Sequence, residues 1–329
     1  MVKAEWTEGR YNEFNQPLCL HDFESEFKLY LSYYNMLSEA ADRGFDNIPY
    51  MRVDFCRVAY LIAIAYGCKP IEIKNVINAK PIIFDIDDIY KIEKPQNIWE
   101  YGLYPEITRR IMEIEKRLGP VGFVSSDTQS PIDVLTEIVD AEEAMCAMFT
   151  DKESIHYLLD LLTQSIEEIN RYQSTIVSNW IGYGHDYPIT RGIHLSDDNA
   201  AFLSPGIYEE FAKPYAERLA KSFGGVTLHC CMRYGQNIEI MANTEGFLGF
   251  DPQLTYHREH EVFPYIKDKG YLRVFTPQID NLYEYYTDII DKTENICGLM
   301  IEVFGNSKDE TLRLAQKVKD YADKKGRCI

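Results

Sequence analysis

GIHLSDDNAAFLSP, residues 192–205, is the stretch of this 329-residue chain that decides its fold. A short apolar run passes into polar residues and then into a stretch of helical periodicity, which is the pattern of a strand followed by a helix. Ser204 and Pro205 mark the start of that helix, because serine caps helices and proline suits their first turn. Residues 226–231, VTLHCC, begin the next unit in the same way.

The same alternation recurs from about Gly122 to the C-terminus, as expected of βα units around a parallel sheet. The strands that we predict are Val121–Ser125, Gly192–Leu195, Val226–His229, Gly246–Phe250, Tyr271–Phe275 and Gly298–Val303. The helices that we predict are Ala141–Phe149 with Lys152–Ser178, one that begins at Ser204, Gln236–Ala242, His257–Lys267, Leu282–Asp291 and Lys308–Asp323.

Two further strands would close these units into a barrel, and Pro49–Phe55 and Pro81–Phe84 are the candidates. We therefore predict a (β/α)₈ TIM barrel formed by residues 1–329 as one domain, with residues 1–48 as an N-terminal helical extension. The alternative is an open doubly wound sheet. No Gly-x-Gly-x-x-Gly follows a predicted strand, so the glycine pattern favours the barrel.

Composition excludes several classes of partner. The formal net charge of −18 argues against nucleic acid and against anionic membranes, which both select basic surfaces. No run approaches the roughly 18 apolar residues of a membrane-spanning helix, and Met1–Gln16 has no apolar signal core. We expect a cytoplasmic protein whose eight cysteines are reduced thiols.

The predicted strands end in polar residues, and in parallel barrels the reactive groups gather at those ends. We assign catalytic roles, in proton transfer or in orienting a ligand, to Asp127, Asp197 and Asp198. We assign binding of a small-molecule substrate to Ser125, Gln129, Asp251, Gln253 and Gln278. Any one of these residues taken alone is as well explained by an ordinary polar loop. Their recurrence at the same end of the strands favours a site.

The most specific feature is His229-Cys230-Cys231. Residues two apart in a strand face the same side, so His229 and Cys231 share the inward face while Cys230 turns toward the helices. Imidazole and thiolate are zinc ligands, and a catalytic zinc needs three protein ligands. Glu302, at the end of the last strand, is the first choice for the third, ahead of Cys297 and Cys328. A buried histidine beside an inert thiol is the alternative.

Three segments resemble the uroporphyrinogen decarboxylase superfamily, which includes zinc-dependent corrinoid methyltransferases. They are Val124–Asp133, then Ile193–Pro205 continuing to Tyr215, and Leu228–Cys231, which lies at the position of the family's His-x-Cys zinc motif. The likeness covers roughly Pro49 to Asp251. It implies a (β/α)₈ barrel, in agreement with the alternation of strands and helices.

The resemblance leaves two chemistries to choose between. Decarboxylases of the family bind carboxylates through Arg-x-x-x-Arg, whereas Arg52 and Arg57 are one residue further apart, which sends the second side chain of a strand to the opposite face. The last strand reads Glu302-Val-Phe-Gly305 in place of the family's Gly-His-Gly. Both departures argue against a decarboxylase.

The methyltransferase branch binds zinc through His-x-Cys and a later cysteine, and Glu302 falls near the position of that cysteine. The resemblance therefore implies a zinc-dependent methyltransferase that moves a methyl group between a corrinoid protein and a thiol or related acceptor. A carboxy-lyase that acts on a carboxylated substrate, and a barrel that binds a ligand without catalysis, stay as alternatives. Whether the chain forms a homodimer is left open.

Overall fold

The computed structural model describes residues 1–6, 22–53, 60–73, 76–184, 187–189, 191–252, 259–274, 281–293, 298–305 and 307–326. The strands are β1 Val2–Trp6, β2 Lys69–Ile73, β3 Val76–Lys80, β4 Phe123–Val124, β5 Trp180–Gly182, β6 Ile193–Ser196, β7 Val226–Cys230, β8 Phe247–Pro252, β9 Tyr271–Val274 and β10 Gly298–Gly305. Short 3-10 helices are η2 Ile86–Lys91, η3 Ile98–Glu100, η4 Asp198–Ala201 and η5 Gly235–Asn237.

The α-helices are α1 Phe23–Asp42, α2 Leu61–Ala65, α3 Tyr104–Leu118, α4 Pro131–Ile138, α5 Ala141–Thr150, α6 Lys152–Thr175, α7 Pro205–Phe211, α8 Lys213–Phe223, α9 Ile238–Ala242, α10 Glu259–Ile266, α11 Leu282–Lys292 and α12 Lys308–Lys324. Among these described helices, none combines the length and the apolar character needed to cross a membrane.

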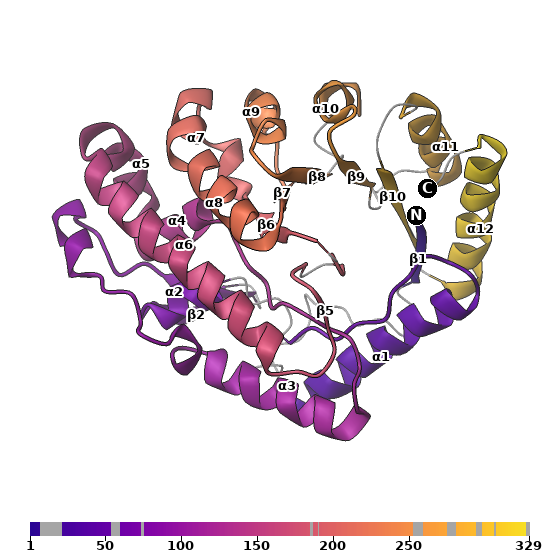
Figure 1. The fold of residues 1–329 in the computed structure, drawn as a ribbon, viewed down its shortest axis with the longest axis horizontal. Coiled ribbons are helices and arrows are strands. Elements are labelled where there is room, and N and C mark those ends of the chain that lie inside the picture. The colour runs from indigo at the N-terminus through magenta and orange to yellow at the C-terminus, as the bar shows by residue number, and fades with distance from the viewer. Residues whose placement is uncertain are drawn as a thin grey trace.

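A parallel sheet of six strands, in the order β1-β10-β9-β8-β7-β6, forms the inner wall of the molecule. Helices α7 to α12 lie along its outer side, as Figure 1 shows. Each of the six strands predicted between Val121 and Val303 is present, although the described part of the predicted strand at Phe275 stops one residue earlier. The alternation of apolar runs with helical periodicity therefore predicted these units correctly.

The wall continues through β4, β5 and the segment around Met51, so that the strands curve into a parallel α/β barrel of the TIM-barrel type. β4 pairs with β5 in parallel, and Tyr183 forms a bridge to Ile193 at the start of β6. Met51 pairs with Phe123, and the amide of Asp46 donates to the carbonyl of Val2, 3.0 Å away. Residues 46–53 thus lie between β4 and β1, in agreement with the strand predicted at 49–55, of which 54 and 55 fall outside the described residues.

Two expectations about the first third of the chain need correction. The strand predicted at 81–84 is not part of the barrel wall. This segment follows the antiparallel pair β2–β3, and its Ile83 forms an isolated bridge to Val139, which is not in a strand of the wall. Residues 1–48 do contain the helix α1, but β1 is a strand of the wall and pairs in parallel with β10. That the whole chain is one domain stays a prediction.

A segment that the sequence did not reveal fills the inside of the barrel. β5 is followed by β6 after a short connection, in which Tyr187 and Ile189 are buried against Met300 of β10. A Cβ on Gly182 would lie 2.0 Å from the carbonyl oxygen of Ile189, so only glycine allows the two backbones to approach so closely. We call residues 187–189 the plug.

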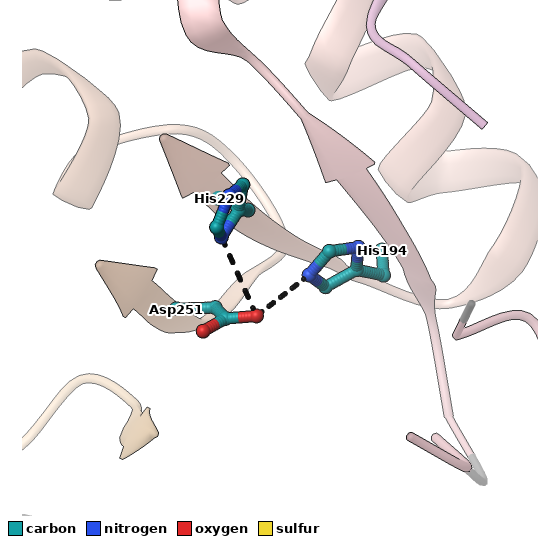
Figure 2. A group of neighbouring side chains, drawn as sticks. All are labelled: His194, His229 and Asp251. Atoms are coloured by element: carbon teal, nitrogen blue, oxygen red, sulfur yellow. Dashed lines mark hydrogen bonds and ion pairs between the residues drawn. The ribbon is translucent and has the colours of Figure 1, made fainter. Parts of the chain in front are cut away.

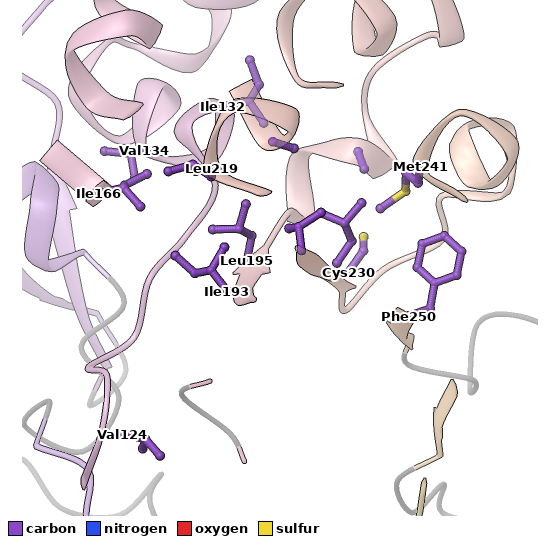
Figure 3. Close-up of a cluster of buried hydrophobic side chains, with 14 of the residues drawn as sticks. Val124, Ile132, Val134, Ile166, Ile193, Leu195, Leu219, Cys230, Met241 and Phe250 are labelled. Atoms are coloured by element: carbon purple, nitrogen blue, oxygen red, sulfur yellow. The ribbon is translucent and has the colours of Figure 1, made fainter. Parts of the chain in front are cut away.

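The strand β7 shows how the alternation positions the site. Val226, Leu228 and Cys230 face the helices and are buried in the apolar core, where Figure 3 shows Cys230 near Leu195 and Phe250. Burying a leucine side chain fully contributes about 1.5–3 kcal/mol. Because this face is fixed by packing, the opposite face of β7 has to point into the barrel.

Candidate functional site

Three side chains with metal-binding donor atoms meet at the carboxyl ends of β6 and β7. They are Asp198, His229 and Cys231, and one donor atom of each lies within 4.8 Å of the others. His229 is in β7, Cys231 follows it, and Asp198 begins η4 just after β6. We call these three residues the donor cluster. His229 and Cys231, the pair selected from the sequence, therefore come together as the alternation of the strand requires.

Backbone hydrogen bonds fix the donor cluster in place. The amide of Cys231 donates to Asp198 Oδ1 over 2.7 Å. The carboxylate of Asp133 in turn accepts the amides of Asp198 and Asn199, each over 2.8 Å, and so satisfies the first donors of η4. Asp198, predicted as a catalytic residue or as one that orients a ligand, thus holds the backbone beside the thiol of Cys231.

Directly below His229 lies a buried group of charged and polar side chains, of which Figure 2 shows Asp251 and His194. Asp251 Oδ2, on β8, is 2.7 Å from Arg273 Nη1, 3.1 Å from His194 Nε2 and 3.5 Å from His229 Nδ1. The side chain of Asp251 is completely buried. Asp251 was expected to bind substrate, but the structure places it in this interior network.

Glu302 completes the network. Its Oε2 accepts from Nε and Nη2 of Arg273 over 3.1 and 2.7 Å. Among the described residues, the groups arranged to hold a metal do not include Glu302, so the third donor near His229 and Cys231 is Asp198. Glu302 was expected to be that ligand. We call Asp251, Arg273, His194 and Glu302 the lower layer.

The lower layer and the donor cluster shift one another's ionisation. Burial alone would raise the pKa of Asp251, but Arg273 and then His229 outweigh it, and the pKa lies well below its usual value. Burial likewise opposes the charged form of His229, but the carboxylate of Asp251 outweighs it and raises the pKa well above normal. Burial raises the pKa of the Cys231 thiol, which His229 partly counteracts.

The buried acids on the other side of the donor cluster have carboxyl and hydroxyl neighbours. Burial, with Asp197 and Asp198 nearby, raises the pKa of Asp133 well above its usual value. Burial and Asp133 do the same to Glu137. Burial also raises the pKa of Asp197 to about 6, although Tyr208 and Ser130 donate hydrogen bonds to it. We call Asp133, Glu137 and Asp197 the acidic flank.

The acidic flank changes the role expected for Asp197. Its Oδ1 accepts from Ser130 over 3.0 Å and its Oδ2 accepts from Tyr208, while the residue is only 1% exposed. Ser130 also caps α4 by accepting the amide of Asp133. Both carboxylate oxygens of Asp197 are therefore engaged in joining α4, η4 and α7, an arrangement that fits a structural role better than proton transfer.

The remaining predicted residues are placed only in part. Ser125 is buried, and its Oγ makes no hydrogen bond within the described part of the chain; the same holds for Gln129 Oε1. Gln129 lies close enough to Glu137 to oppose the rise in the pKa of that acid. Asp127 is half-buried near Glu137. Gln253, Gln278, Cys297, Cys328 and Arg57 lie outside the described residues.

Sequence reasoning missed His194, Arg273 and Glu137 as members of the site. The first two left a signal. Arg273 interrupts the apolar run Tyr271–Val274, and an arginine inside a strand that packs on both faces requires a buried anion. His194 lies on β6, the strand whose end carries Asp197 and Asp198, which the sequence had already assigned to the site. Glu137 gave no signal, since a glutamate in a helix is usually solvated.

Fold and site together define a class: a parallel α/β barrel whose histidine, cysteine and carboxylate donors gather at the carboxyl ends of its strands. A family profile described as Uroporphyrinogen decarboxylase (URO-D) matches residues 54–262. The chain belongs to this family. The residues that carried the resemblance in the sequence lie within or beside that range.

A solved structure described as "methyltransferase from Methanosarcina mazei" is similar in fold. The two chains share 16% sequence identity with a TM-score of 0.67, over 99% of this chain and 94% of the other. Among curated proteins, none matches the chain significantly.

Proposed function

We propose that this chain is a zinc-dependent methyltransferase that moves a methyl group between a corrinoid carried by a partner protein and a thiol or related small acceptor. The observation that carries the proposal is the donor cluster, in which an imidazole, a thiol and a carboxylate lie within 4.8 Å of one another. The similarity in fold to a methyltransferase supports the choice of reaction class. A cytoplasmic location stays a prediction of the sequence.

The donor cluster fits a zinc ion. Zinc binds cysteine sulfur at about 2.3 Å and histidine nitrogen or carboxylate oxygen at about 2.0–2.2 Å, so its ligand atoms lie roughly 3–4 Å apart. Small side-chain adjustments would bring the present atoms to that spacing. We propose His229, Cys231 and Asp198 as the three protein ligands, with Asp198 in the place that the sequence assigned to Glu302.

Bound zinc would supply a Lewis acid that keeps a coordinated acceptor thiol deprotonated and ready to attack a methyl group. The chain's own residues would hold this arrangement. Asp198 fixes the backbone of Cys231 through its amide, and the half-buried donor cluster lies at the strand ends, where a substrate can reach it. We propose that Ser125 and Gln129, which have buried oxygens without hydrogen-bond partners among the described residues, bind polar groups of the acceptor.

The first test is metal content. Elemental analysis of protein purified without chelators or a metal-binding tag should find about one zinc per chain, because three protein ligands are enough for a catalytic zinc. The double variant His229→Ala, Cys231→Ala should lose it. Cys230→Ala is the matched control, because that thiol faces the apolar core, and should keep the metal. A wild-type protein that takes up no zinc would overturn the mechanism and leave a metal-free carboxy-lyase as the function to test.

A second comparison identifies the third ligand. Asp198→Asn removes a charged donor while keeping an oxygen that can accept from the amide of Cys231, and we expect zinc affinity to fall at least tenfold. Glu302→Gln keeps an acceptor for Arg273 and should change zinc affinity much less. The reverse order of effects would restore Glu302 as the ligand.

A further inference from the structure

One imidazole nitrogen of His229 faces the lower layer, and this concerns how a metal would be bound. An imidazole offers one nitrogen to a metal, and the hydrogen bond made by its other nitrogen fixes which one that is. Nδ1 of His229 faces Asp251 Oδ2, 3.5 Å away, as Figure 2 shows. Catalytic hydrogen bonds are often long in the absence of ligand and shorten when the site is assembled.

Asp251 is itself held rigidly. Arg273 Nη1 and His194 Nε2 approach the same carboxylate oxygen, Oδ2, at 2.7 and 3.1 Å. Glu302 holds the guanidinium of Arg273 from the other side through Nε and Nη2. The side chains of Asp251 and His194 are completely buried, and that of Arg273 is 7% exposed. Rotation of the carboxylate would therefore break buried charged contacts, each of which is costly to lose.

The trio His194, His229 and Asp251 could itself be taken for a metal site, because donor atoms of these residues lie within 4.8 Å of one another. The guanidinium of Arg273 argues against that interpretation. It lies 2.7 Å from the oxygen that a metal would need and already supplies a positive charge there. The trio is better explained as a support for His229 than as a second metal centre.

We propose that Asp251, fixed by Arg273 and His194, is a positioning residue that keeps the proton of His229 on Nδ1 and directs Nε2 toward the metal shared with Cys231. This inference rests on the proposed zinc site. Supporting hydrogen bonds of this kind typically change metal affinity by about 10- to 100-fold. Glu302, the last member of the chain of contacts, then acts on the site through Arg273 and not as a ligand.

The test measures zinc affinity by competition with a chromophoric chelator. Asp251→Asn keeps the shape of the side chain but removes its charge, and we expect zinc binding about 10- to 100-fold weaker than in the wild type. Glu26→Gln is the matched control. It neutralises another completely buried acid, on α1, that also pairs with an arginine, Arg110, and it should leave the affinity unchanged.

Nitrogen NMR of histidine-labelled wild type reports the protonated nitrogen of His229 directly, with Asp251 unchanged. In the zinc-loaded protein, His229, assigned with His229→Gln, should show a protonated Nδ1 and a metal-bound Nε2. Metal on Nδ1, or equal zinc affinity in wild type and a folded Asp251→Asn variant, would overturn the inference alone. A wild type that binds no zinc would instead overturn the proposed function together with it.

Discussion

The pKa values of buried acids are shifted in opposite directions on the two sides of the donor cluster. On β8 and β10, Asp251 and Glu302 share Arg273, and the pKa of Asp251 lies well below its usual value. On α4 and after β6, the acidic flank is surrounded by other carboxyls and by hydroxyl and amide donors, and its pKa values are raised. The residue type and the degree of burial are alike on both sides.

The difference teaches that burial alone does not decide the state of a carboxyl group. A guanidinium within hydrogen-bonding distance keeps a charge in the interior, whereas desolvation beside like charges favours the protonated acid. The lower layer can therefore act as a fixed anion that orients His229. In the acidic flank, Asp133 and Asp197 instead accept hydrogen bonds that join α4, η4 and α7.

Removing the cation should break the lower layer. In Arg273→Met, Asp251 and Glu302 would stay buried without their partner, and we expect the free energy of unfolding to fall by about 3–5 kcal/mol. Urea unfolding followed by circular dichroism measures the loss. Arg43→Met, which removes an exposed pair with Glu39, is the control and should have little effect. Equal losses in the two variants would show that Arg273 does not hold the network.

On the acidic flank, the variant Glu137→Gln should become more stable than the wild type as the pH rises. Burial raises the pKa of Glu137, so the folded state keeps its proton where the unfolded chain has lost it. The stability of the wild type therefore falls as the pH rises from the unfolded pKa toward the folded one, by at most about 1.4 kcal/mol per pH unit. Glutamine does not titrate. The variant should gain on the wild type between pH 5 and pH 8 in urea titrations, and parallel curves would contradict this.

The smallest expected effect is that of Tyr208→Phe. The hydroxyl of Tyr208 donates to Asp197, and its loss leaves a buried carboxyl oxygen unpaired, which costs about 1–3 kcal/mol. Thermal or urea unfolding at pH 7 measures it. Tyr101→Phe, at a ring that is 45% exposed, provides the comparison. If Tyr208→Phe lowered the free energy of unfolding as much as is expected for Arg273→Met, the hydrogen bonds of the acidic flank would stabilise the protein as strongly as the ion pairs of the lower layer.

The fold was predictable where periodicity carries the information. From β6 to α12 the apolar runs and helical stretches predicted each strand and each α-helix, because each face packs on a core with its own period, whereas α4 and β5 were not predicted. β1 was missed because Lys3 and Glu5 point inward as charged residues and so hide the apolar signal of a buried strand. The plug was missed because a connection gives no periodic pattern.

The site was predictable to the extent that it lies on one strand. The placement of His229 and Cys231 follows from the alternation of β7. Asp198, and not the predicted Glu302, is the carboxylate beside them, because η4 brings Asp198 to the amide of Cys231. Likewise, the partners of Asp251 come from three different strands, and their side-chain pairing depends on the register of the sheet. Local sequence does not contain that register.

The positions of the plug and the donor cluster have a kinetic consequence. Tyr187 and Ile189 pack against Met300. The ring of Tyr187 lies beside His194 and the guanidinium of Arg273, so the plug lies next to the lower layer. The donor cluster lies at the strand ends. In the proposed reaction a protein-borne methyl donor and a small acceptor would both have to reach the donor cluster at the strand ends. Because the acceptor thiol would attack the methyl group of the donor directly, both reactants would have to be bound at once, and double-reciprocal plots of rate against either reactant would intersect.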